Sequence, residues 1–376
     1  MTEKKRLRVA VLFGGRSAEH EVSIASATSV IRALDPAKYD VVPIGISKDG
    51  RWLAGGGAQK MLADTLRKGR HVTLAPEPGT RKLLVRDEQG SAPPLGIDVV
   101  FPVLHGTYGE DGTLQGLLEL ANLPYVGCGV LASSVGMDKV VQKRLFEQAG
   151  LPVVKYQALP RSQWETDPEA TLADIQRRFH FPVFLKPATL GSSVGMTKAH
   201  NPAELAAGLD LAAQFAQKLL IERSVDGREI EVAILGNEDP RASVPGEIIP
   251  HREFYDYEAK YTEEGTQLIV PAPLKPRQTV KVQEYAIRAF QSIDGRGMAR
   301  VDFFLERHTG RLYVNEVNTI PGFTSISMYP RLWEASGVTY PELIDRLIRL
   351  ALEQHREKQR TRFSFNPPPG GGVLSG

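Results

Sequence analysis

Two oxygen-bearing side chains, Glu316 and Asn318, stand two residues apart in the run VNEVNTIPG. Side chains at i and i+2 on a strand point to the same face of a sheet. Asp302 lies upstream among apolar residues, where an unpaired carboxylate is costly. The segment RHTG between them predicts a hairpin turn, which would put Asp302 and Glu316 on neighbouring antiparallel strands, facing the same way. These residue types suit Mg²⁺, but a solvent-facing edge strand would show the same alternation.

A glycine- and serine-rich segment, KPATLGSSVGM at 186–196, follows a second apolar run. Glycines let backbone N–H groups approach phosphate oxygens, and Lys186 could place its ammonium beside them. The chain has neither a Walker A motif nor GxGxxG, so a P-loop kinase and a dinucleotide fingerprint are not supported. A glycine hairpin turn is the structural alternative. The co-occurrence of this loop with the downstream acidic residues favours a single nucleotide–metal site.

Composition limits the class of protein. The 376 residues suit about two or three domains, and the hydrophobic content of 42% allows them to bury cores. The formal charge of +2, from 46 basic and 44 acidic residues, gives no reason to predict binding to nucleic acid or to an anionic membrane. The lone Cys128 excludes an internal disulfide and a thiolate zinc cluster. The apolar run near the N-terminus is too short for a signal peptide, and no run approaches the ~18 apolar residues of a membrane span, so a cytoplasmic protein is predicted.

Apolar periodicity predicts the elements that would position these residues. A strand at 7–13, a helix through Ala27 and Leu34, and a strand at 39–47 make a β-α-β opening, which predicts a parallel sheet with a right-handed crossover. Residues 50–96, rich in glycine, proline and charge, are predicted to be loop and peripheral insertion. Further strands are expected at 97–106, 181–188, 218–225, 229–235, 246–250, 297–305 and 311–318, and helices before Gly150, at 279–293 and at 340–356. The segment PYVGCG at 124–129 is expected to close the first unit.

Longer motifs connect these features to a known family. The chain resembles the D-alanine–D-alanine ligase family of the ATP-grasp superfamily, with the motifs in that family's order over nearly the whole chain, although residues 50–96 and the tail fall outside the resemblance. The motifs that carry it are GGRSAEHEVS (14–23), HGTYGEDGTLQG (105–116), MDK (137–139), GSSVGM (191–196), FYDYEAKY (254–261), MARVDFF (298–304) and NEVNTIPGFTSISMYP (315–330).

The resemblance implies an α/β ATP-grasp fold, with an N-terminal parallel α/β domain followed by two α+β lobes that clamp ATP. The expected divisions are an N-terminal substrate domain at 1–133, a central lobe at 134–224, a C-terminal lobe with the magnesium site at 225–357, and a disordered tail at 358–376.

The implied activity is ATP-dependent joining of two D-alanine molecules through an acyl phosphate, for peptidoglycan precursor synthesis. The alternatives are a ligase that makes D-alanyl-D-lactate or D-alanyl-D-serine, and a nucleotide-binding regulatory module without catalysis, which is disfavoured because the expected charged groups are present. ATP and two Mg²⁺ ions are the implied cofactors, with Mn²⁺ as a possible substitute, and the implied assembly is a homodimer.

Residue by residue, the resemblance also assigns roles. The metal ligands would be Asp302, Glu316 and Asn318. The nucleotide would contact Lys139, Lys186 and Ser193 at its phosphates, Glu222 at adenine and Glu229 at the ribose, although Glu231 shares the face of Glu229. The catalytic set would be a hydrogen-bonded triad of Glu19, Ser192 and Tyr261, with Arg300 and the Gly322 N–H at the developing oxyanion. Substrate would contact His105, Lys260, Ser327 and Met328. Arg223 departs from the lysine that many members have beside the adenine residue.

Overall fold

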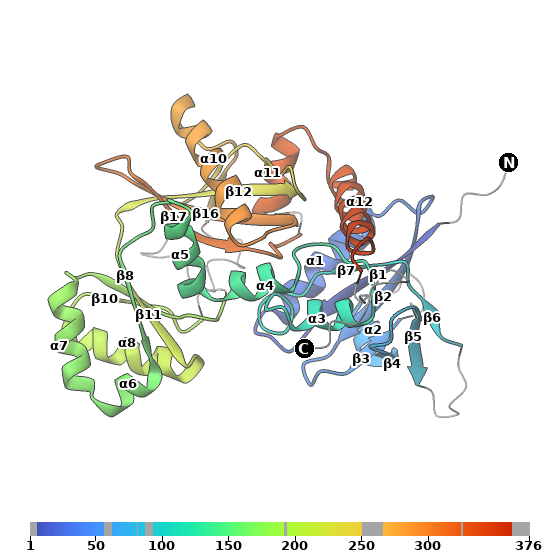
Figure 1. Ribbon diagram of the computed structural model, residues 1–376, viewed down its shortest axis with the longest axis horizontal. Coiled ribbons are helices and arrows are strands. Elements are labelled where there is room, and N and C mark those ends of the chain that lie inside the picture. The colour runs from blue at the N-terminus through green and yellow to red at the C-terminus, as the bar shows by residue number, and fades with distance from the viewer. Residues whose placement is uncertain are drawn as a thin grey trace, which may run out of the picture.

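The computed structural model describes residues 6–55, 62–80, 82–86, 93–191, 194–249, 266–324 and 326–362. Within these residues the strands form three sheets, an N-terminal, a central and a C-terminal one. In the view of Figure 1 the N-terminal sheet lies on the right, the central sheet at the lower left, and the C-terminal sheet above it. The predicted site residues come from the edges where these sheets meet.

The N-terminal sheet begins with the predicted β-α-β unit. Strand β1 (Leu7–Gly14) pairs in parallel with β2 (Tyr39–Ile46) and with β7 (Val99–Pro102), and α1 (His20–Ala33) connects the first two strands. The alternate residues Val9, Val11 and Phe13 are buried in one core cluster together with α1 residues such as Val30. The predicted parallel sheet is therefore confirmed for these three strands, whereas the pairings beyond β2 are antiparallel.

The prediction for residues 50–96 is wrong, because the described part of this segment extends the N-terminal sheet. It contains β3 (Trp52–Ala54), α2 (Leu62–Lys68), β4 (Arg70–Leu74), β5 (Lys82–Arg86) and β6 (Leu95–Gly96). The sheet order is β6-β5-β4-β3-β2-β1-β7. Each strand is short, and β4 and β5 bury only alternate residues, such as Val72 and Leu74, so polar neighbours hide the apolar pattern there. The segment 124–129, expected to close this unit, joins the sheet through a bridge between Val100 and Tyr125.

The central sheet is antiparallel in the order β10-β9-β11-β8. Its strands are β8 (Tyr156–Pro160), β9 (Val183–Pro187), β10 (Thr197–Ala199) and β11 (Lys218–Arg223). Helices α6 (Arg161–Thr166), α7 (Pro168–Arg178) and α8 (Pro202–Phe215) pack against it. The glycine- and serine-rich segment starts in β9, and its described residues lead from there to β10.

The C-terminal sheet is also antiparallel, and its longest strands carry the predicted acidic residues. It consists of β12 (Gly227–Gly236), β13 (Arg241–Ala242), β14 (Gly246–Ile249), β15 (Gln267–Ile269), β16 (Gly297–Glu306) and β17 (Leu312–Asn318). Helices α10 (Pro276–Ser292) and α11 (Met328–Ala335) accompany it. The predicted hairpin turn at 307–310 is confirmed, and Gly310 takes the left-handed conformation there with φ 66°.

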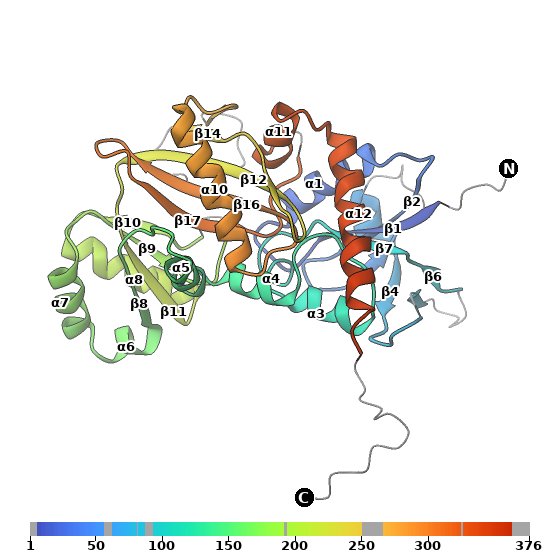
Figure 2. The same cartoon turned by 45° about the horizontal axis from the view of Figure 1, so that its top comes forward.

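Three helices connect the N-terminal and central sheets: α3 (Thr113–Leu120), α4 (Val130–Met137) and α5 (Lys139–Gln148). The last helix, α12 (Tyr340–Lys358), contacts both β7 and β16, and Figure 2 shows it running between the N-terminal and C-terminal sheets. Residues 363–376, most of the predicted disordered tail, lie outside the described residues.

One buried cluster joins the first and last parts of the chain. It contains residues of β1, β7, α1, β12, α11 and α12, and within it the rings of Phe101 and Phe323 meet edge to face with centroids 5.9 Å apart. The central sheet has a core cluster of its own, which includes Leu185 and Leu209. The N-terminal and C-terminal sheets are therefore packed on a shared core, with the central lobe attached beside them.

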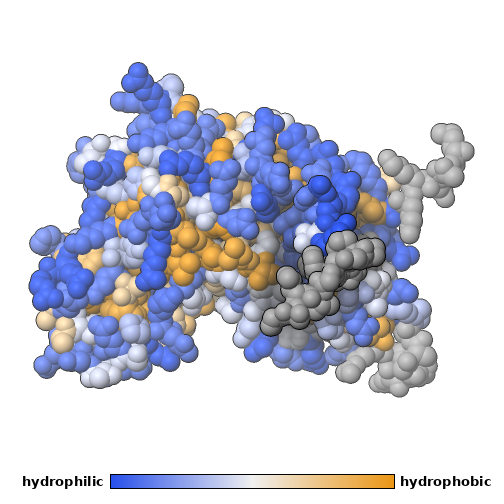
Figure 3. Space-filling model, viewed as in Figure 1, coloured by the Kyte–Doolittle hydropathy of each residue, from blue (hydrophilic) through white to orange (hydrophobic). Residues whose placement is uncertain are grey.

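Two surface properties bear on what the molecule can contact. Figure 3 shows apolar residues gathered around α4, where Val130 and Leu131 are 40% and 61% exposed. In the described part of the chain, no helix is both long enough and apolar enough to cross a membrane.

Candidate functional site

A cavity of about 680 Å³ lies between the central and C-terminal sheets. This volume falls within the range of small-molecule sites, which is roughly 300–1,000 Å³. The predicted site residues that line it are Lys139, Lys186, Glu222, Glu229, Arg300, Asp302 and Glu316. Charged groups from five sheet strands and one helix therefore converge on a single cavity.

The two predicted metal-binding carboxylates face each other across a pair of strands. Asp302 of β16 is directly opposite Glu316 of β17, and the register shifts immediately afterwards, between Asp302 and Phe303. The Asn318 side-chain amide donates to Asp302 Oδ2 at 2.9 Å. The predicted common face is confirmed, since the bulge adds its extra residue only beyond this pair.

Cations neutralise both carboxylates in this structure. Arg300 donates from Nε and Nη2 to the two carboxylate oxygens of Asp302, each at 2.7 Å, and its Nε lies 3.1 Å from Glu231. Lys139 Nζ lies 3.1 Å from Glu316. Burial lowers the pKa of Arg300, but Asp302 and Glu231 outweigh it and raise that pKa well above its ordinary value. Arg300 is therefore held permanently charged.

The oxygen donors at this place suit a hard cation. Two carboxylates and one side-chain carbonyl are the ligand types that Mg²⁺ takes, usually together with phosphate oxygens and water. No group of three His, Cys, Asp or Glu side chains suited to a metal is found among the described residues, so any ion here would rely on the amide and on a ligand. The donor set of Asp302, Glu316 and Asn318 fits a phosphate-bound Mg²⁺ better than a cage made of protein alone.

A buried carboxylate between two lysines forms another wall of the cavity. Glu222 of β11 lies 2.5 Å from Lys143 Nζ and 2.6 Å from Lys186 Nζ. Burial alone would raise the pKa of Glu222, but the two lysines outweigh it and lower that pKa to about 2. Lys143, which is 1% exposed, was not predicted as a site residue. The available signal was its spacing from Lys139, because residues at i and i+4 share a helix face.

Lys139 contacts both the loop after β9 and the hairpin of β16 and β17, which carries Asp302 and Glu316. It is the first residue of α5, and the side chain of the preceding Asp138 caps that helix by accepting from the N–H groups of Val140 and Val141 at 3.0 and 3.1 Å. Lys139 Nζ donates to the Leu190 carbonyl at 2.9 Å while it pairs with Glu316. The helix cap thus determines where this ammonium stands.

The predicted first-substrate residues lie together at the edge of the N-terminal sheet. Glu19 follows β1 and is buried, and its N–H donates to Ser17 Oγ at 3.0 Å. A Cβ atom added at Gly191 would lie only 3.4 Å from Glu19 Oε2, so the loop after β9 reaches this carboxylate. His105 follows β7 and is also buried, which lowers its pKa and keeps its imidazole neutral.

The segment after β17 brings the predicted oxyanion and second-substrate residues together. A Cβ at Gly322 would come within 2.8 Å of Ser327 Oγ, so glycine is needed for this approach. Ser327 Oγ accepts from the Thr324 N–H at 3.0 Å, and Met328 opens α11 with its side chain buried. Ser192, Ser193, Lys260 and Tyr261 lie outside the described residues.

Two further acidic residues belong to this region. Glu231, considered only as a neighbour of Glu229, faces Arg300 and pairs in register with Asp302. Glu110, not predicted as a site residue, accepts from the Gly106 N–H at 2.6 Å and from the Ile320 N–H at 3.1 Å. Burial and the charge of Glu19 raise the pKa of Glu110 to about 8, against the lowering effect of the two amides.

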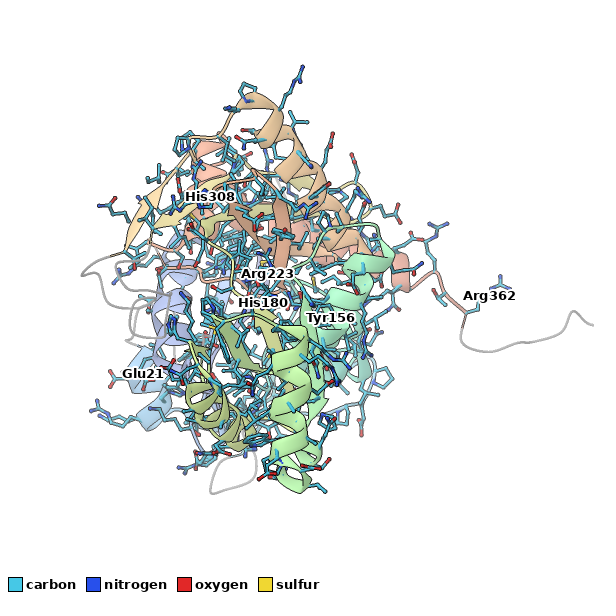
Figure 4. All side chains as sticks on the ribbon, turned by 90° about the vertical axis from the view of Figure 1, so that its left-hand side faces the viewer. Glu21, Tyr156, His180, Arg223, His308 and Arg362 are labelled. Carbon is cyan, nitrogen blue, oxygen red and sulfur yellow. The ribbon has the colours of Figure 1, made fainter. Side chains whose placement is uncertain are left out.

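Arg223, the residue that departs from the family pattern, connects the central sheet to the C-terminal sheet. It donates to Glu306 Oε1 at 3.0 Å and to the Tyr313 hydroxyl at 3.2 Å. Figure 4 shows it in the middle of the molecule, between the strands of the two sheets. Its guanidinium is therefore bound by side chains of β16 and β17, while Arg223 itself lines the cavity.

Comparison with known proteins agrees with this geometry. Family models described as D-ala D-ala ligase N-terminus and C-terminus match residues 8–128 and 145–349. The first of these includes residues 50–96, so the expectation that this segment lies outside the resemblance is wrong.

Individual relatives match over nearly the whole chain. A D-alanine–D-alanine ligase of Heliobacterium modesticaldum is 50% identical and covers 94% of this chain and 96% of its own. One of Thermoanaerobacter sp. is 51% identical, with coverage of 95% and 99%.

Solved structures give the same result. The D-alanine–D-alanine ligase from Coxiella burnetii superposes with a TM-score of 0.84 at 40% identity, covering 95% of this chain and 97% of that one. The VanG D-Ala:D-Ser ligase from Enterococcus faecalis gives 0.83 at 35% identity, covering 92% and 100%. The predicted ATP-grasp fold is confirmed, and the chain belongs to the D-alanine–D-alanine ligase family.

Proposed function

We propose that this chain joins two D-alanine molecules into D-alanyl-D-alanine at the expense of ATP, as a step in peptidoglycan precursor synthesis. The observation that carries this proposal is the convergence of Lys139, Lys186 and Arg300 on a cavity that ends at the Asp302–Glu316 pair. Transfer of a phosphoryl group to a carboxylate brings two anions together, and such a ring of cations lowers that repulsion.

The cavity between the two sheets is the proposed nucleotide site. Glu222 would accept from the adenine amino group, held in the ionised form by its lysines, and Glu229 would accept from the ribose hydroxyls. Lys139, Lys186 and Ser193 would bind the phosphates. Mg²⁺ at Asp302, Glu316 and Asn318 would supply positive charge to the phosphate oxygens, and two ions, replaceable by Mn²⁺, are proposed for this set.

The first step joins the first D-alanine to the phosphoryl group. Its carboxylate oxygen forms a bond to the γ-phosphorus while the bond to the bridging oxygen of ADP breaks. Glu19 would hold the ammonium of this D-alanine, with the neutral His105 nearby. Ser192 and Tyr261 are proposed to complete a hydrogen-bonded triad with Glu19 that closes the site.

The second step forms the peptide bond. The neutral amine of the second D-alanine attacks the acyl carbon, and the C–O bond to phosphate then breaks as the amine loses its proton. Arg300 and the Gly322 N–H would stabilise the developing oxyanion; loss of one such donor typically costs about 2.7–4 kcal/mol. Lys260, Ser327 and the backbone at Met328 would bind the carboxylate of the second D-alanine.

The setting of the reaction is part of the proposal. ATP as substrate favours a cytoplasmic location. A homodimer is proposed, and the exposed Leu120 of α3 and Leu131 of α4 offer apolar surface for it. A second candidate activity is D-alanyl-D-serine synthesis, since the similar VanG structure is described as a D-Ala:D-Ser ligase.

Two assays test the function. The first measures phosphate release from MgATP with and without D-alanine, and we expect release to depend on D-alanine. The second offers D-alanine together with D-serine or D-lactate, and we expect D-alanyl-D-alanine to dominate. Phosphate release that ignores D-alanine would refute the activity, whereas a mixed product mainly of D-alanyl-D-serine would favour the second candidate.

A further inference from the structure

The segment from Ile320 to Phe323 contains Gly322. Side chains bind the backbone N–H and C=O groups of its first and last residues. The Ile320 N–H donates to Glu110 Oε1 at 3.1 Å, and the Ile320 carbonyl lies 3.1 Å from His105 Nδ1. The Phe323 N–H donates to Ser26 Oγ at 3.2 Å, and the Phe323 carbonyl accepts from the Tyr340 hydroxyl at 2.7 Å. Side chains rather than a sheet ladder therefore satisfy this stretch.

Three of these four side chains come from the N-terminal part of the chain. Ser26 lies on α1, while His105 and Glu110 lie in the loop between β7 and α3. Ser26 Oγ is also 3.1 Å from His105 Nε2, which connects two of the holding groups to each other. The position of Gly322 is thus determined by the N-terminal domain, although Gly322 itself follows the C-terminal hairpin.

Glu110 occupies the central place in this arrangement. Its other oxygen accepts from the Gly106 N–H at 2.6 Å, and a Cβ at Gly106 would lie 2.8 Å from Glu19 Oε2. One carboxylate therefore joins the backbone beside Glu19 to the backbone two residues before Gly322. Glu19 is the proposed contact of the first substrate's ammonium, and Gly322 is the proposed contact of the oxyanion.

We propose that Glu110 is a positioning residue for the ligation, which holds the Gly322 N–H at a fixed place relative to Glu19. This inference rests on the proposed function, because it concerns the geometry of that reaction. Glu110 touches neither substrate nor nucleotide in this account. Its effect on the rate comes from alignment, to which such reactions are sensitive at the scale of about 1 Å.

Glu110→Gln is the direct test, because the amide keeps the shape but offers one acceptor oxygen where two N–H groups need one each. Asp111→Asn is the matched control on the same loop. Asp111 also accepts from two backbone N–H groups, those of Tyr108 at 2.8 Å and Thr113 at 3.1 Å, but both belong to its own segment. Asp111→Asn removes one carboxylate oxygen acceptor, as Glu110→Gln does, but it leaves the hydrogen bond from the Ile320 N–H to Glu110 in place.

For Glu110→Gln we expect kcat to fall roughly 10- to 100-fold, the effect of leaving a buried backbone N–H without its acceptor, while KM for ATP stays within about twofold of wild type. Asp111→Asn should keep both constants within about twofold. Thermal unfolding and MgATP binding are measured on all three proteins. A general structural loss would move KM for ATP and the unfolding temperature together, whereas misalignment moves kcat alone.

Ser26→Ala provides a second variant should Glu110→Gln fail to fold. It removes the acceptor of the Phe323 N–H, at the other flank of Gly322, and should show the same selective loss in kcat. If wild type ligates D-alanine but Glu110→Gln, or in its place Ser26→Ala, has the kcat of Asp111→Asn, the positioning role is overturned. A wild-type protein without D-alanine-dependent turnover would instead refute the proposed function.

Discussion

At the scale of single residues, the site is a set of buried and half-buried charges with partners of opposite sign. Glu222 has Lys143 and Lys186, Asp302 has Arg300, and Glu316 has Lys139. Burying a charge is costly unless it is paired. A bound nucleotide with its metal would add both signs at once, so it could enter without leaving an uncompensated charge behind.

Replacement of Glu316 by glutamine should therefore affect turnover more than binding. The amide keeps an oxygen for the metal but removes one negative charge, and we expect kcat to fall roughly 100-fold or more, as when one charge-stabilising group is lost. MgATP affinity should weaken only in part, because Asp302 and the lysines remain. Steady-state kinetics and equilibrium binding measure the two effects, with Glu334→Gln on the exposed face of α11 as control. Near-native turnover would exclude Glu316 from the metal set.

Lys143 should stabilise the fold in a pH-dependent way. The pKa of Glu222 lies near 2 in the folded protein, below its ordinary value of 4.5, so the ionised pair stabilises the protein above about pH 4.5 and is lost as the pH falls toward 2. Lys143→Met should then lower the free energy of unfolding by up to roughly 3 kcal/mol at pH 7, and by progressively less below pH 4.

Urea unfolding between pH 7 and pH 3 measures this difference. The exposed Lys281→Met is the control, and its effect should be small at every pH. A destabilisation by Lys143→Met that stays constant across the range would show that packing, rather than the charge of Glu222, is what Lys143 provides.

The sequence could predict some of these residues and not others. Asp302 and Glu316 could be placed because strand periodicity and a hairpin turn are local signals, and their cross-strand pairing follows from them. For Lys143 the sequence offered only its helical spacing from Lys139, because lysines are usually solvated and its burial depends on a strand much later in the chain. Glu110 was missed for the same reason, since its partner Ile320 is distant in sequence.

At the scale of elements, the ends of helices and strands position the chemistry. Lys139 opens α5, and Gly322 lies on the segment that leaves β17. Buried strands such as β12 and β16 could be predicted from their apolar runs. The short strands in 50–96 could not, because each shows too few alternations for a period to stand out, and their pairing partners rather than their own residues make them strands.

The cap of α5 gives a prediction at this scale. Asp138→Ala should lower the free energy of unfolding by roughly 1 kcal/mol and weaken MgATP binding, because the first turn carries Lys139. Asp138→Asn should preserve the cap, since asparagine accepts the same bonds, and lose only the pairing with Lys218, which is 40% exposed. Denaturant unfolding and nucleotide binding of both variants test this. Equal losses in the two would assign the effect to charge instead of capping.

At the scale of the whole molecule, the shared core makes the N-terminal and C-terminal sheets one unit, with the central lobe as a second unit. Helix α12 contacts α1, β7 and β16 and so strengthens the first unit. The cavity lies where the two units meet.

Two buried leucines separate these units experimentally. Leu209→Ala, in the central core, should raise amide exchange in β8 to β11 and leave β1 and β16 protected. Leu347→Ala, in α12, should raise exchange in β1 and β16 together. Each change should cost roughly 2–5 kcal/mol within its unit. Hydrogen exchange that rises throughout the chain for either variant would contradict the division into two units.

The central claim is ligation of D-alanine through an acyl phosphate, and isotope transfer tests it most directly. D-alanine labelled with ¹⁸O in its carboxylate is turned over with unlabelled MgATP, and the released phosphate is analysed by mass spectrometry. An acyl phosphate leaves one carboxylate oxygen on phosphorus, so the account predicts one ¹⁸O in each phosphate and one dipeptide formed per phosphate. Phosphate without ¹⁸O, released while D-alanyl-D-alanine is formed, would contradict it.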